Sequence, residues 1–541
     1  MKRRTFIGTA AAGAGMLGLP ALSACKAPQE KEHVEESFQD DFALKEWTAS
    51  QLQTAMKQGK YTSRQITEMY LQRLQLVDQT GPSLHSVIEL NPDALQIADD
   101  MDKERKAGKS RGLMHGIPVL IKDNIDTADK MSTTAGSLAL SGSIALKDAF
   151  IVGRLREAGA VLLGKTNLSE WANIRSSRST SGWSGRGGQT HNPYVTDRNP
   201  CGSSSGSGVA VSANLCAMAI GTETDGSIVC PSSTNGIVGI KPTVGLWSRS
   251  GIIPISHSQD TAGPMARSVE DAATLLGLLT GTDQSDAATL GSAGKTNSDY
   301  IRFLDPNGLK GARIGVARSF FGFHPVVDQL MNQAIQQMKE LGALIIDPVE
   351  IKNLREIEAP EFEVLLYELK ADLNKYLAGL RPDIPYRTLK DLIAFNEKNK
   401  DKEMPWFGQE TFIAAEAKGG LTDKAYTDAL AKCREGARKK GIDATLGEHK
   451  LDAIIAPTGS PAWPTDWING DHFTGGSSSP AAVAGYPAIT VPAGFVDQLP
   501  VGITFMGTAW SEPVLIRLAY AYEQKSLNRK APTFIPTLKC S

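Results

Sequence analysis

The stretch DAFIVGRLREAGAVLLGKT, residues 148–166, decides the fold class of this chain. Its first part, 148–158, places apolar side chains at helical spacing, and Gly159 then ends the predicted helix. Residues 160–163 are apolar and favour a buried strand. Helix, turn and strand in this order are typical of a unit of an α/β sheet.

The same stretch carries the letters of a phosphate-binding loop, because Gly159 and Gly164 bracket 160–163 and Lys165 and Thr166 follow. A phosphate loop runs from a strand through a solvated turn into a helix, and its backbone N–H groups curl around the anion. Here the order is reversed and the bracketed residues are apolar. We therefore expect no nucleotide site.

Helix and strand patterns continue on both sides of this unit. Two helices are expected in 46–78, with Thr48 and Thr62 as their caps and Gly59 as the break between them. The other expected elements are strands at 115–126, 312–317, 343–347, 451–458 and 488–495, a helix followed by a strand in 209–224, and a helix at 326–342. This alternation predicts an α/β fold.

The predicted architecture is a single large domain, 42–541, with a mixed, mostly parallel central sheet covered by helices on both faces. Residues 350–450 are mostly helical in pattern and charged, which predicts an insertion over one rim. The chain is 41% hydrophobic, as suits a packed core, and its net charge of −2 gives no field that would recruit nucleic acid. The oligomeric state is not predicted.

The N-terminus has the character of a targeting segment. Arg3 and Arg4 precede a weakly apolar stretch that ends in Leu-Ser-Ala-Cys at Cys25. This pattern resembles a twin-arginine export signal followed by a bacterial lipobox. It implies that 1–24 are removed, that Cys25 is acylated and anchors the protein to the membrane, and that 25–41 form a polar tether. The expected localisation is a membrane-anchored lipoprotein of the bacterial cell envelope.

Five further cysteines follow Cys25 along the chain. They are Cys201, Cys216, Cys230, Cys433 and Cys540. They form no CxxC pair and no zinc spacing, and an odd number argues against a complete disulfide framework. One disulfide bridge is compatible with this pattern.

Two serine-rich stretches can carry chemistry. The first, CGSSSGSG at 201–208, closes a long Gly- and Ser-rich loop, and long loops in compact domains are usually functional. It contains the letters of a nucleophile elbow centred on Ser204, but an elbow needs a strand directly before it, and here a loop precedes it. An elbow also needs a later histidine, which several residues supply by position alone: His257, His324, His449 and His472.

The second stretch is TETDGSIVCP at 222–231. Asp225 and Gly226 before Ser227 predict a tight turn at the end of a strand. Such a turn can present several backbone N–H groups to one point, as an oxyanion hole does.

These two stretches, together with Lys122 in GIPVLIKDN, resemble the amidase signature family. The family pattern has a lysine after a G-x-P strand, a Gly/Ser loop, and a nucleophilic serine 24 residues after the first serine of that loop, and Ser203 and Ser227 have this spacing. The resemblance extends from about 47 to about 527, and its catalytic core is 115–265. The segments 175–194 and 222–228 are most similar to the bacterial peptide-amidase branch.

The resemblance implies hydrolysis of a carboxylic amide, in this branch a peptide C-terminal amide, to acid and ammonia through an acyl-enzyme on Ser227. Lys122 would be the base, because burial lowers the pKa of a lysine, and Ser203, after a cis peptide bond, would relay the proton. Backbone N–H groups of Thr224, Asp225, Gly226 and Ser227 would receive the oxyanion. Ser204 would support the loop. No metal and no cofactor are implied.

The sequence departs from the common family pattern at four positions. Asp225 stands where a glycine is usual, Cys201 and Ser205 replace glycines of the loop, and Val229 replaces a frequent arginine. Three other functions stay open. They are a broad fatty or aryl amide hydrolase, the glutamine-amidase subunit of a tRNA-dependent amidotransferase, and a lipid-tethered binding protein without activity.

Overall fold

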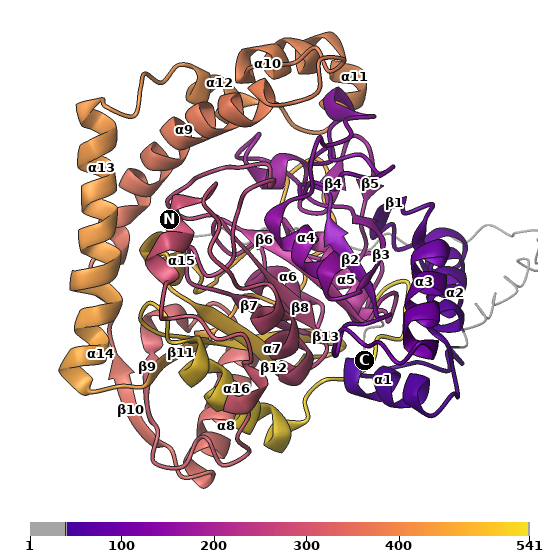
Figure 1. Ribbon diagram of the computed structural model, residues 1–541. Coiled ribbons are helices and arrows are strands. Elements are labelled where there is room, and N and C mark those ends of the chain that lie inside the picture. Colours follow the sequence, from indigo (N-terminus) through magenta and orange to yellow (C-terminus); the bar gives the residue numbers. More distant parts are fainter. Residues whose placement is uncertain (1–37, 39, 539–541) are drawn as a thin grey trace, which may run out of the picture. The chain divides into compact units, whose positions relative to one another are not determined.

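The central feature of the computed structural model, which describes residues 38 and 40–538, is an eleven-stranded sheet within that part of the chain (Figure 1). In spatial order its strands are β1 (Val87–Leu90), β3 (Val161–Thr166), β2 (Pro118–Lys122), β6 (Met218–Glu223), β8 (Thr261–Ala266), β7 (Val238–Lys241), β12 (Ala488–Val496), β13 (Leu499–Met506), β11 (Ala453–Pro457), β9 (Arg313–Ala317) and β10 (Leu344–Val349). A separate ribbon pairs β4 (Trp183–Ser184) with β5 (Gly188–Gln189).

The sheet is mixed, and its parallel pairs lie in two groups. Parallel pairing joins β3 to β2 and β2 to β6 on one side, and β11 to β9 and β9 to β10 on the other. Antiparallel pairs connect the strands between these groups and attach β1 at the edge. The predicted α/β class, with one large mixed sheet and flanking helices, is confirmed.

Helices cover both faces of the sheet. The short helices α5 (Ser205–Ser212) and α6 (Val229–Thr234) pack together on one face, and α7 (Val269–Leu278), α8 (Pro325–Glu340) and α16 (Glu512–Ser526) pack on the other (Figure 1). The remaining helices near the sheet are α1 (Ala49–Lys57), α2 (Ser63–Arg73), α3 (Ala94–Lys106), α4 (Phe150–Glu157) and α15 (Ser479–Ala484). Both predicted caps are present, because Thr48 and Thr62 each form a complete capping box.

A helical arm runs along one side of the molecule, drawn in orange in Figure 1. It consists of α9 (Leu354–Ala378), α10 (Leu389–Lys398), α11 (Lys400–Glu403), α12 (Glu410–Glu416), α13 (Lys424–Arg434), a π-helical segment (Glu435–Ile442) and α14 (Asp443–His449). Part of the arm has its own apolar cluster, in which Leu369, Leu373 and Phe412 pack with Trp171 of the core. This contact fixes the C-terminal half of α9 above the sheet.

The unit 148–166 folds as the sequence predicts, with α4 followed by β3. Lys165 lies inside β3, fully buried, and its Nζ donates to Thr133 Oγ1 at 3.0 Å and to the carbonyl oxygen of Ile125 at 2.5 Å. Its pKa is lowered by that burial. The lysine of the apparent phosphate loop is therefore a strand residue that ties β3 to the segment after β2.

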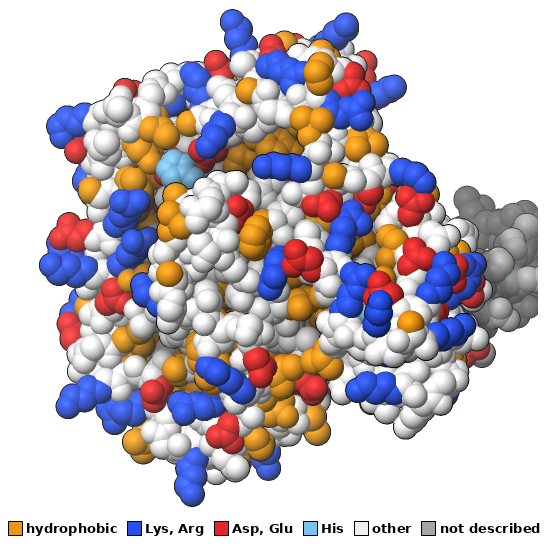
Figure 2. Space-filling view, in the orientation of Figure 1, with side chains coloured by type: hydrophobic (Ala, Val, Ile, Leu, Met, Phe, Trp, Pro, Cys, Tyr) orange, Lys and Arg blue, Asp and Glu red, His pale blue; other side chains and the backbone are white. Residues whose placement is uncertain are grey.

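The expectations for 1–24 and for an acylated Cys25 lie outside the described residues. Of the expected tether 25–41, the described Asp40 belongs to the folded part, since its carboxylate pairs with the buried guanidinium of Arg73 at 2.6 Å. Within the described part of the chain, no helix has the length and apolar character that crossing a bilayer requires. Figure 2 shows acidic and basic side chains interspersed over the visible face, as the small net charge suggests.

Candidate active site

The site forms where two neighbouring parallel strands end at the same edge of the sheet. Strands β2 and β6 pair in parallel with Ile121 opposite Ile220, so Lys122 at the end of β2 lies beside the end of β6. The carboxyl ends of parallel strands are where loops gather functional groups. The Ser203 loop and the turn that carries Ser227 both meet this edge.

Lys122 is fully buried and lies within hydrogen-bonding distance of four oxygens. Its Nζ is 2.7 Å from Ser203 Oγ, 3.0 Å from Ser204 Oγ, 2.9 Å from Thr222 Oγ1 and 3.3 Å from the Thr222 carbonyl oxygen. Each of these oxygens is uncharged. The amine is therefore solvated by dipoles and has no carboxylate within salt-bridge distance among the described residues.

Burial lowers the pKa of Lys122 from its usual 10.5 to about 7. The negative charges of Asp260 and Glu223 act in the opposite direction and raise this pKa, but more weakly. Asp123, the next residue, faces the other way, with its carboxylate on Thr134 Oγ1 and 3.6 Å from Arg186. A neutral amine is therefore well populated near pH 7, and the neighbouring carboxylate does not hold it charged.

Ser203 lies in a loop between Pro200 and the start of α5. The Gly202–Ser203 peptide bond is cis, as the resemblance implied, and the carbonyl oxygen of Ser203 accepts the N–H of Ser169 at 3.1 Å. Cys201 forms a disulfide with Cys230. This bond answers the question that the sequence left open. The pairing of two residues 29 apart in the chain depends on the fold and not on any local spacing.

Ser227 follows a tight turn at the end of β6, as predicted. Gly226 has a φ of +80°, which a residue with a side chain rarely adopts, so glycine is needed at this position. The buried carboxylate of Glu223 accepts the N–H groups of Ile228 at 2.7 Å and Val229 at 3.0 Å, and this fixes the start of α6. Sequence reasoning missed Glu223, although an acid at a helix N-terminus is a recognised stabilising signal.

The turn leaves backbone donors free. Among the described residues, the N–H groups of Asp225, Gly226 and Ser227 donate to no protein acceptor. Thr224 is fixed through its side chain, whose Oγ1 donates to Asp260 at 2.6 Å. The Asp225 carboxylate accepts from Ser479 Oγ at 2.6 Å. This arrangement suits a turn that receives an oxygen atom of a bound molecule.

The structure brings the three predicted residues to one place but does not join all of them. The backbone N–H of Ser204 donates to the carbonyl oxygen of Ser227 at 3.2 Å, so the two loops are in contact. Within the described residues, no hydrogen bond forms between the hydroxyl groups of Ser203 and Ser227. Lys122 and Ser203 are in direct contact, and Ser227, whose residue is 9% exposed, lies beside the loop of Ser203.

The nucleophile-elbow alternative for Ser204 does not fit the structure. Its residue is fully buried, and its hydroxyl donates to the carbonyl oxygen of Thr222 at 3.0 Å and accepts the Thr222 N–H at 3.1 Å. Ser204 therefore ties the loop to β6. The supporting position expected for it agrees with these contacts.

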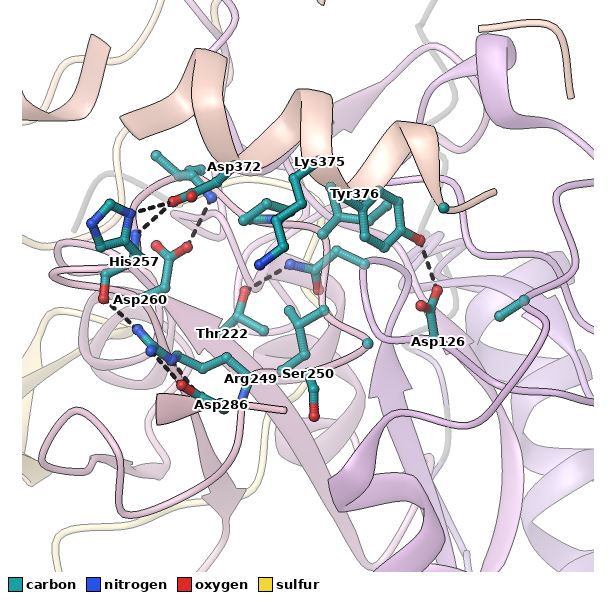
Figure 3. Close-up of a pocket in the computed structure, with 18 of the residues that line it drawn as sticks. Asp126, Thr222, Arg249, Ser250, His257, Asp260, Asp286, Asp372, Lys375 and Tyr376 are labelled. Atoms are coloured by element: carbon teal, nitrogen blue, oxygen red, sulfur yellow. Dashed lines mark hydrogen bonds and ion pairs between the residues drawn. The ribbon is translucent and has the colours of Figure 1, made fainter. Parts of the chain in front are cut away.

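A cavity of about 550 Å³ opens beside the site (Figure 3). The segment Thr222–Thr224 borders it on one side, the apolar residues 252–255 form a wall, and Lys375 points into it from α9. Figure 2 shows a hollow beneath α9 with apolar side chains in its depth. Neither Ser203 nor Ser227 lines this cavity, so it adjoins the turn from the side of Thr224.

The acidic groups around the cavity have partners. Asp126 accepts from Tyr376 at 2.7 Å, and Asp286 pairs with Arg249 at 2.7 Å. Asp260, between the cavity and Lys122, accepts two backbone N–H groups besides Thr224, and burial raises its pKa to about 6. The cavity therefore combines apolar walls with a few fixed polar groups, as binding pockets for organic molecules do.

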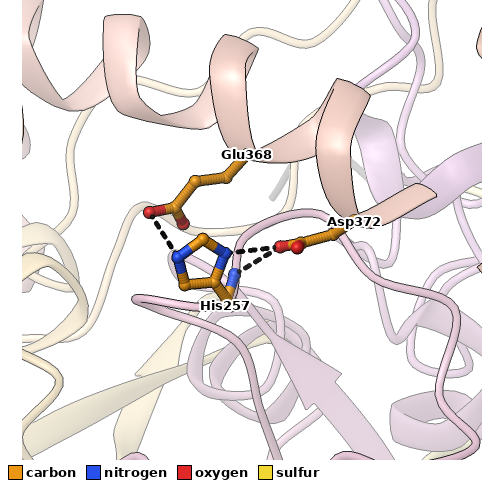
Figure 4. A group of neighbouring side chains, drawn as sticks. All are labelled: His257, Glu368 and Asp372. Atoms are coloured by element: carbon orange, nitrogen blue, oxygen red, sulfur yellow. Dashed lines mark hydrogen bonds and ion pairs between the residues drawn. The ribbon is translucent and has the colours of Figure 1, made fainter. Parts of the chain in front are cut away.

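One cluster of His257, Glu368 and Asp372 joins this wall to α9 (Figure 4). His257 Nδ1 lies 2.8 Å from Asp372 and Nε2 lies 3.2 Å from Glu368. Glu368 also accepts from Ser258 and Tyr426. Because protein donors already occupy these carboxylates, the cluster acts as a brace between the loop 255–260 and α9.

The chain belongs to the amidase family, because the family model described as Amidase matches residues 65–516. It is therefore an enzyme that hydrolyses linear amides. Its fold is similar to the crystal structure of native peptide amidase from Stenotrophomonas maltophilia, with a TM-score of 0.87 and 53% identity over 91% of this chain and 99% of that one.

Curated relatives cover similar shares of the chain. A protein of Arabidopsis thaliana named as a probable amidase is 44% identical over 91% of this chain and 93% of the relative. A protein of Schizosaccharomyces pombe whose name also describes it as an amidase is 37% identical over 91% of this chain and 88% of the relative. The predicted membership of the amidase signature family, with peptide amidase as a close neighbour, is confirmed.

These relatives correct the predicted localisation. The plant and fungal amidases are eukaryotic proteins and not lipoproteins of a bacterial envelope. The localisation inferred from Arg3, Arg4 and Cys25 is therefore wrong. The prediction depended on a short pattern, which consists of a basic pair, a weakly apolar stretch and one cysteine. No contact within the described fold supports that pattern.

Proposed function

We propose that the enzyme hydrolyses the C-terminal amide of peptides through an acyl-enzyme on Ser227, with Lys122 as base and Ser203 as proton relay. The observation that carries this proposal is the Lys122 amine, fully buried and 2.7 Å from the Ser203 hydroxyl, at the edge where the Ser227 turn ends. A buried amine beside hydroxyl groups is suited to remove a proton, because burial disfavours its charged form.

The hydrogen bonds around Lys122 favour one direction of proton transfer. The Ser204 hydroxyl uses its proton on the Thr222 carbonyl oxygen, so it can only accept from Lys122. Thr222 Oγ1 also accepts from Lys122. A neutral amine has two N–H donors and one lone pair, and Ser204 Oγ, Thr222 Oγ1 and the Thr222 carbonyl oxygen offer enough acceptors for both donors. The lone pair is left for the Ser203 hydroxyl.

The proposed reaction starts with Ser227 Oγ attacking the amide carbonyl carbon while its proton passes through Ser203 to Lys122. The carbonyl oxygen becomes an oxyanion that the free N–H groups of Asp225, Gly226 and Ser227 stabilise, and Thr224 completes this turn. The proton returns through Ser203 to the nitrogen, the C–N bond breaks, and ammonia leaves. Water, deprotonated along the same path, then hydrolyses the ester of Ser227 and releases the acid.

The choice of a peptide amide is supported by the similarity to peptide amidase and by the cavity beside Thr224, whose volume of about 550 Å³ suits a short peptide. A broad fatty or aryl amide hydrolase, a glutamine-amidase subunit and an inactive binding protein are the other outcomes of the test. A membrane anchor is not part of the proposal.

The test measures ammonia release from a dipeptide amide, an aryl amide and free glutamine under the same conditions. We expect the dipeptide amide to have the highest kcat/KM. A fluorophosphonate probe should label the wild-type enzyme and not Ser227→Ala, and Ser203→Ala should label slowly. Equal labelling of wild type and Ser227→Ala would contradict the nucleophile, and a preference for glutamine or the aryl amide would contradict the substrate.

A further inference from the structure

One covalent bond joins the two segments that carry the proposed serines. Cys201 comes two residues before Ser203, and Cys230 comes three residues after Ser227, in the first turn of α6. We infer that the Cys201–Cys230 disulfide keeps the Ser203 loop beside the Ser227 turn, as proton transfer between the two serines requires, so that reducing this bond lowers turnover. This inference rests on the proposed function.

Hydrogen bonds also join the two segments, and the disulfide lies between them along the loop. Thr234 Oγ1 and Asn235 Nδ2, after the middle of α6, donate to the carbonyl oxygen of Pro200 at 2.7 and 2.9 Å. The Ser204 N–H donates to the Ser227 carbonyl oxygen at 3.2 Å. The disulfide lies between these two attachments along the loop, next to Gly202. It is therefore the link nearest to Ser203 on the N-terminal side.

The serine pair needs such a link because regular structure does not set its geometry. Ser203 lies in an irregular loop and Ser227 in a turn, and their hydroxyl groups make no direct hydrogen bond in the described structure. A small change in the distance between the loops therefore decides whether proton transfer can occur. Misplacement by about 1 Å lowers rates by roughly a hundredfold in well-oriented reactions.

The disulfide lies in the segments that carry the proposed serines and does not line the cavity. Trp463 packs against both cysteines and fixes the outer loop, since its carbonyl oxygen accepts the Asn199 N–H at 2.7 Å. The residues that line the cavity, among them Thr222–Thr224 and 249–255, include neither cysteine. Loss of the bond should therefore change kcat and leave KM nearly unchanged.

In the test, a dithiol reduces the Cys201–Cys230 disulfide. Dithiothreitol gives two electrons and two protons to the S–S bond, forming the thiols of Cys201 and Cys230 and the cyclic disulfide of the reagent. The exposed fractions of the two cysteines are 6% and 7%, so the bond is nearly but not fully covered. A second route, the double variant Cys201→Ala/Cys230→Ala, removes the bond without any reagent.

The experiment compares wild type, dithiothreitol-treated wild type and the double variant, with Cys433→Ala as matched control. Cys433 is a buried free cysteine on α13, distant from the serine loops along the chain and outside the cluster of Cys201, Cys230 and Trp463. Mass spectrometry of unreduced peptides establishes whether the bond is present. The readouts are kcat and KM for a dipeptide amide, the rate of fluorophosphonate labelling, and the unfolding midpoint.

We expect reduction and the double variant to lower kcat and the labelling rate together by roughly tenfold or more, with KM changed by less than about twofold. Oxidation of the reduced wild type should restore both rates, and Cys433→Ala should behave as wild type throughout. The inference would be overturned if protein without the disulfide had a normal kcat at temperatures well below its unfolding midpoint. Free Cys201 and Cys230 thiols in fully active enzyme would also overturn it. If Ser227→Ala also labels normally, the proposed function itself has failed.

Discussion

Lys122 Nζ and Ser203 Oγ lie 2.7 Å apart although 81 residues separate them in the chain. The contact exists because β2 and β6 are parallel neighbours and the Ser203 loop returns over their ends before α5 begins. It places a fully buried amine against a hydroxyl group with no carboxylate in salt-bridge distance among the described residues.

The pH dependence of turnover should report the ionisation of Lys122. Its pKa is lowered to about 7 by burial, and the neutral amine is the active form of the proposed base. Plotted against pH, log kcat/KM should rise with a slope of about one below pH 7 and level off above it. Steady-state rates on an uncharged dipeptide amide measure this. A profile that is flat from pH 5 to 9 would exclude Lys122 as the titrating base.

The same profile should shift when a nearby charge is removed. Asp260 raises the pKa of Lys122, so Asp260→Asn should move the ascending limb to lower pH. The substitution keeps the shape of a side chain that accepts from Thr224 and from the N–H groups of Ile255 and Ser256. A limb that moves to higher pH would contradict the electrostatic assignment. The matched control is Asp271→Asn, because the Asp271 carboxylate is also buried and accepts the N–H of Ala49.

Glu223 should be required for the geometry of the Ser227 turn. One carboxylate oxygen, Oε2, accepts the N–H groups of both Ile228 and Val229, and Glu223→Gln replaces this carboxylate with a neutral amide, whose oxygen is a weaker acceptor. We expect kcat to fall by roughly tenfold with little change in KM, because a misplaced oxyanion donor weakens binding of the transition state more than of the substrate.

Glu512→Gln is a control matched in burial and in bonding. Glu512 is 1% exposed and accepts the N–H of Thr243, away from the turn. Both variants should lower the unfolding midpoint, but only Glu223→Gln should lower kcat. An equal loss of kcat in the two variants would show that Glu223 acts through general stability.

Motifs and periodicity predicted much of this molecule, and long-range contacts account for the rest. The α4–β3 unit could be predicted from local pattern, and Lys122, Ser203 and Ser227 are singled out by the resemblance to the amidase signature family. The influence of Asp260 on Lys122 could not, because it depends on how the loop 255–260 folds back beside β6. The Cys201–Cys230 pairing has the same origin. The Glu223 bonds are local, to residues five and six positions further along, and they depend on the conformation of the Ser227 turn.

The brace formed by His257 should stabilise the cavity wall most at low pH. The hydrogen bond to Asp372 is the main cause that raises the pKa of His257. A raised pKa in the folded state means that the stabilisation is fully present below the unfolded value of about 6.5 and is lost as pH rises through the folded pKa. His257→Gln should therefore lower the unfolding midpoint at pH 5.5 and have less effect at pH 8.5.

The size of this effect should be small. The side chain of His257 is 42% exposed, and solvent screens exposed ion pairs to about 1 kcal/mol or less. The variant should also raise KM, since the loop it releases forms part of the wall that includes Pro254 and Ile255. Thermal unfolding and KM at the two pH values test this. A larger loss of stability at pH 8.5 than at pH 5.5 would refute the assignment.

Replacing Lys122 by methionine should abolish activity and at the same time stabilise the fold at neutral pH and below. A lysine whose pKa falls from 10.5 to about 7 on folding binds fewer protons in the folded than in the unfolded state between these values. The wild-type free energy of unfolding therefore rises with pH across this window, relative to Lys122→Met, by up to about 1.4 kcal/mol per pH unit. The stability advantage of Lys122→Met over wild type should be largest below pH 7 and should shrink towards pH 10. Lys390→Met, at an exposed position of α10, is the control and should show no such trend. Urea unfolding at pH 6, 8 and 10 measures the difference in free energy of unfolding between Lys122→Met and wild type. If this difference grew with pH, the amine would be charged in the folded enzyme and could not be the base of the proposed reaction.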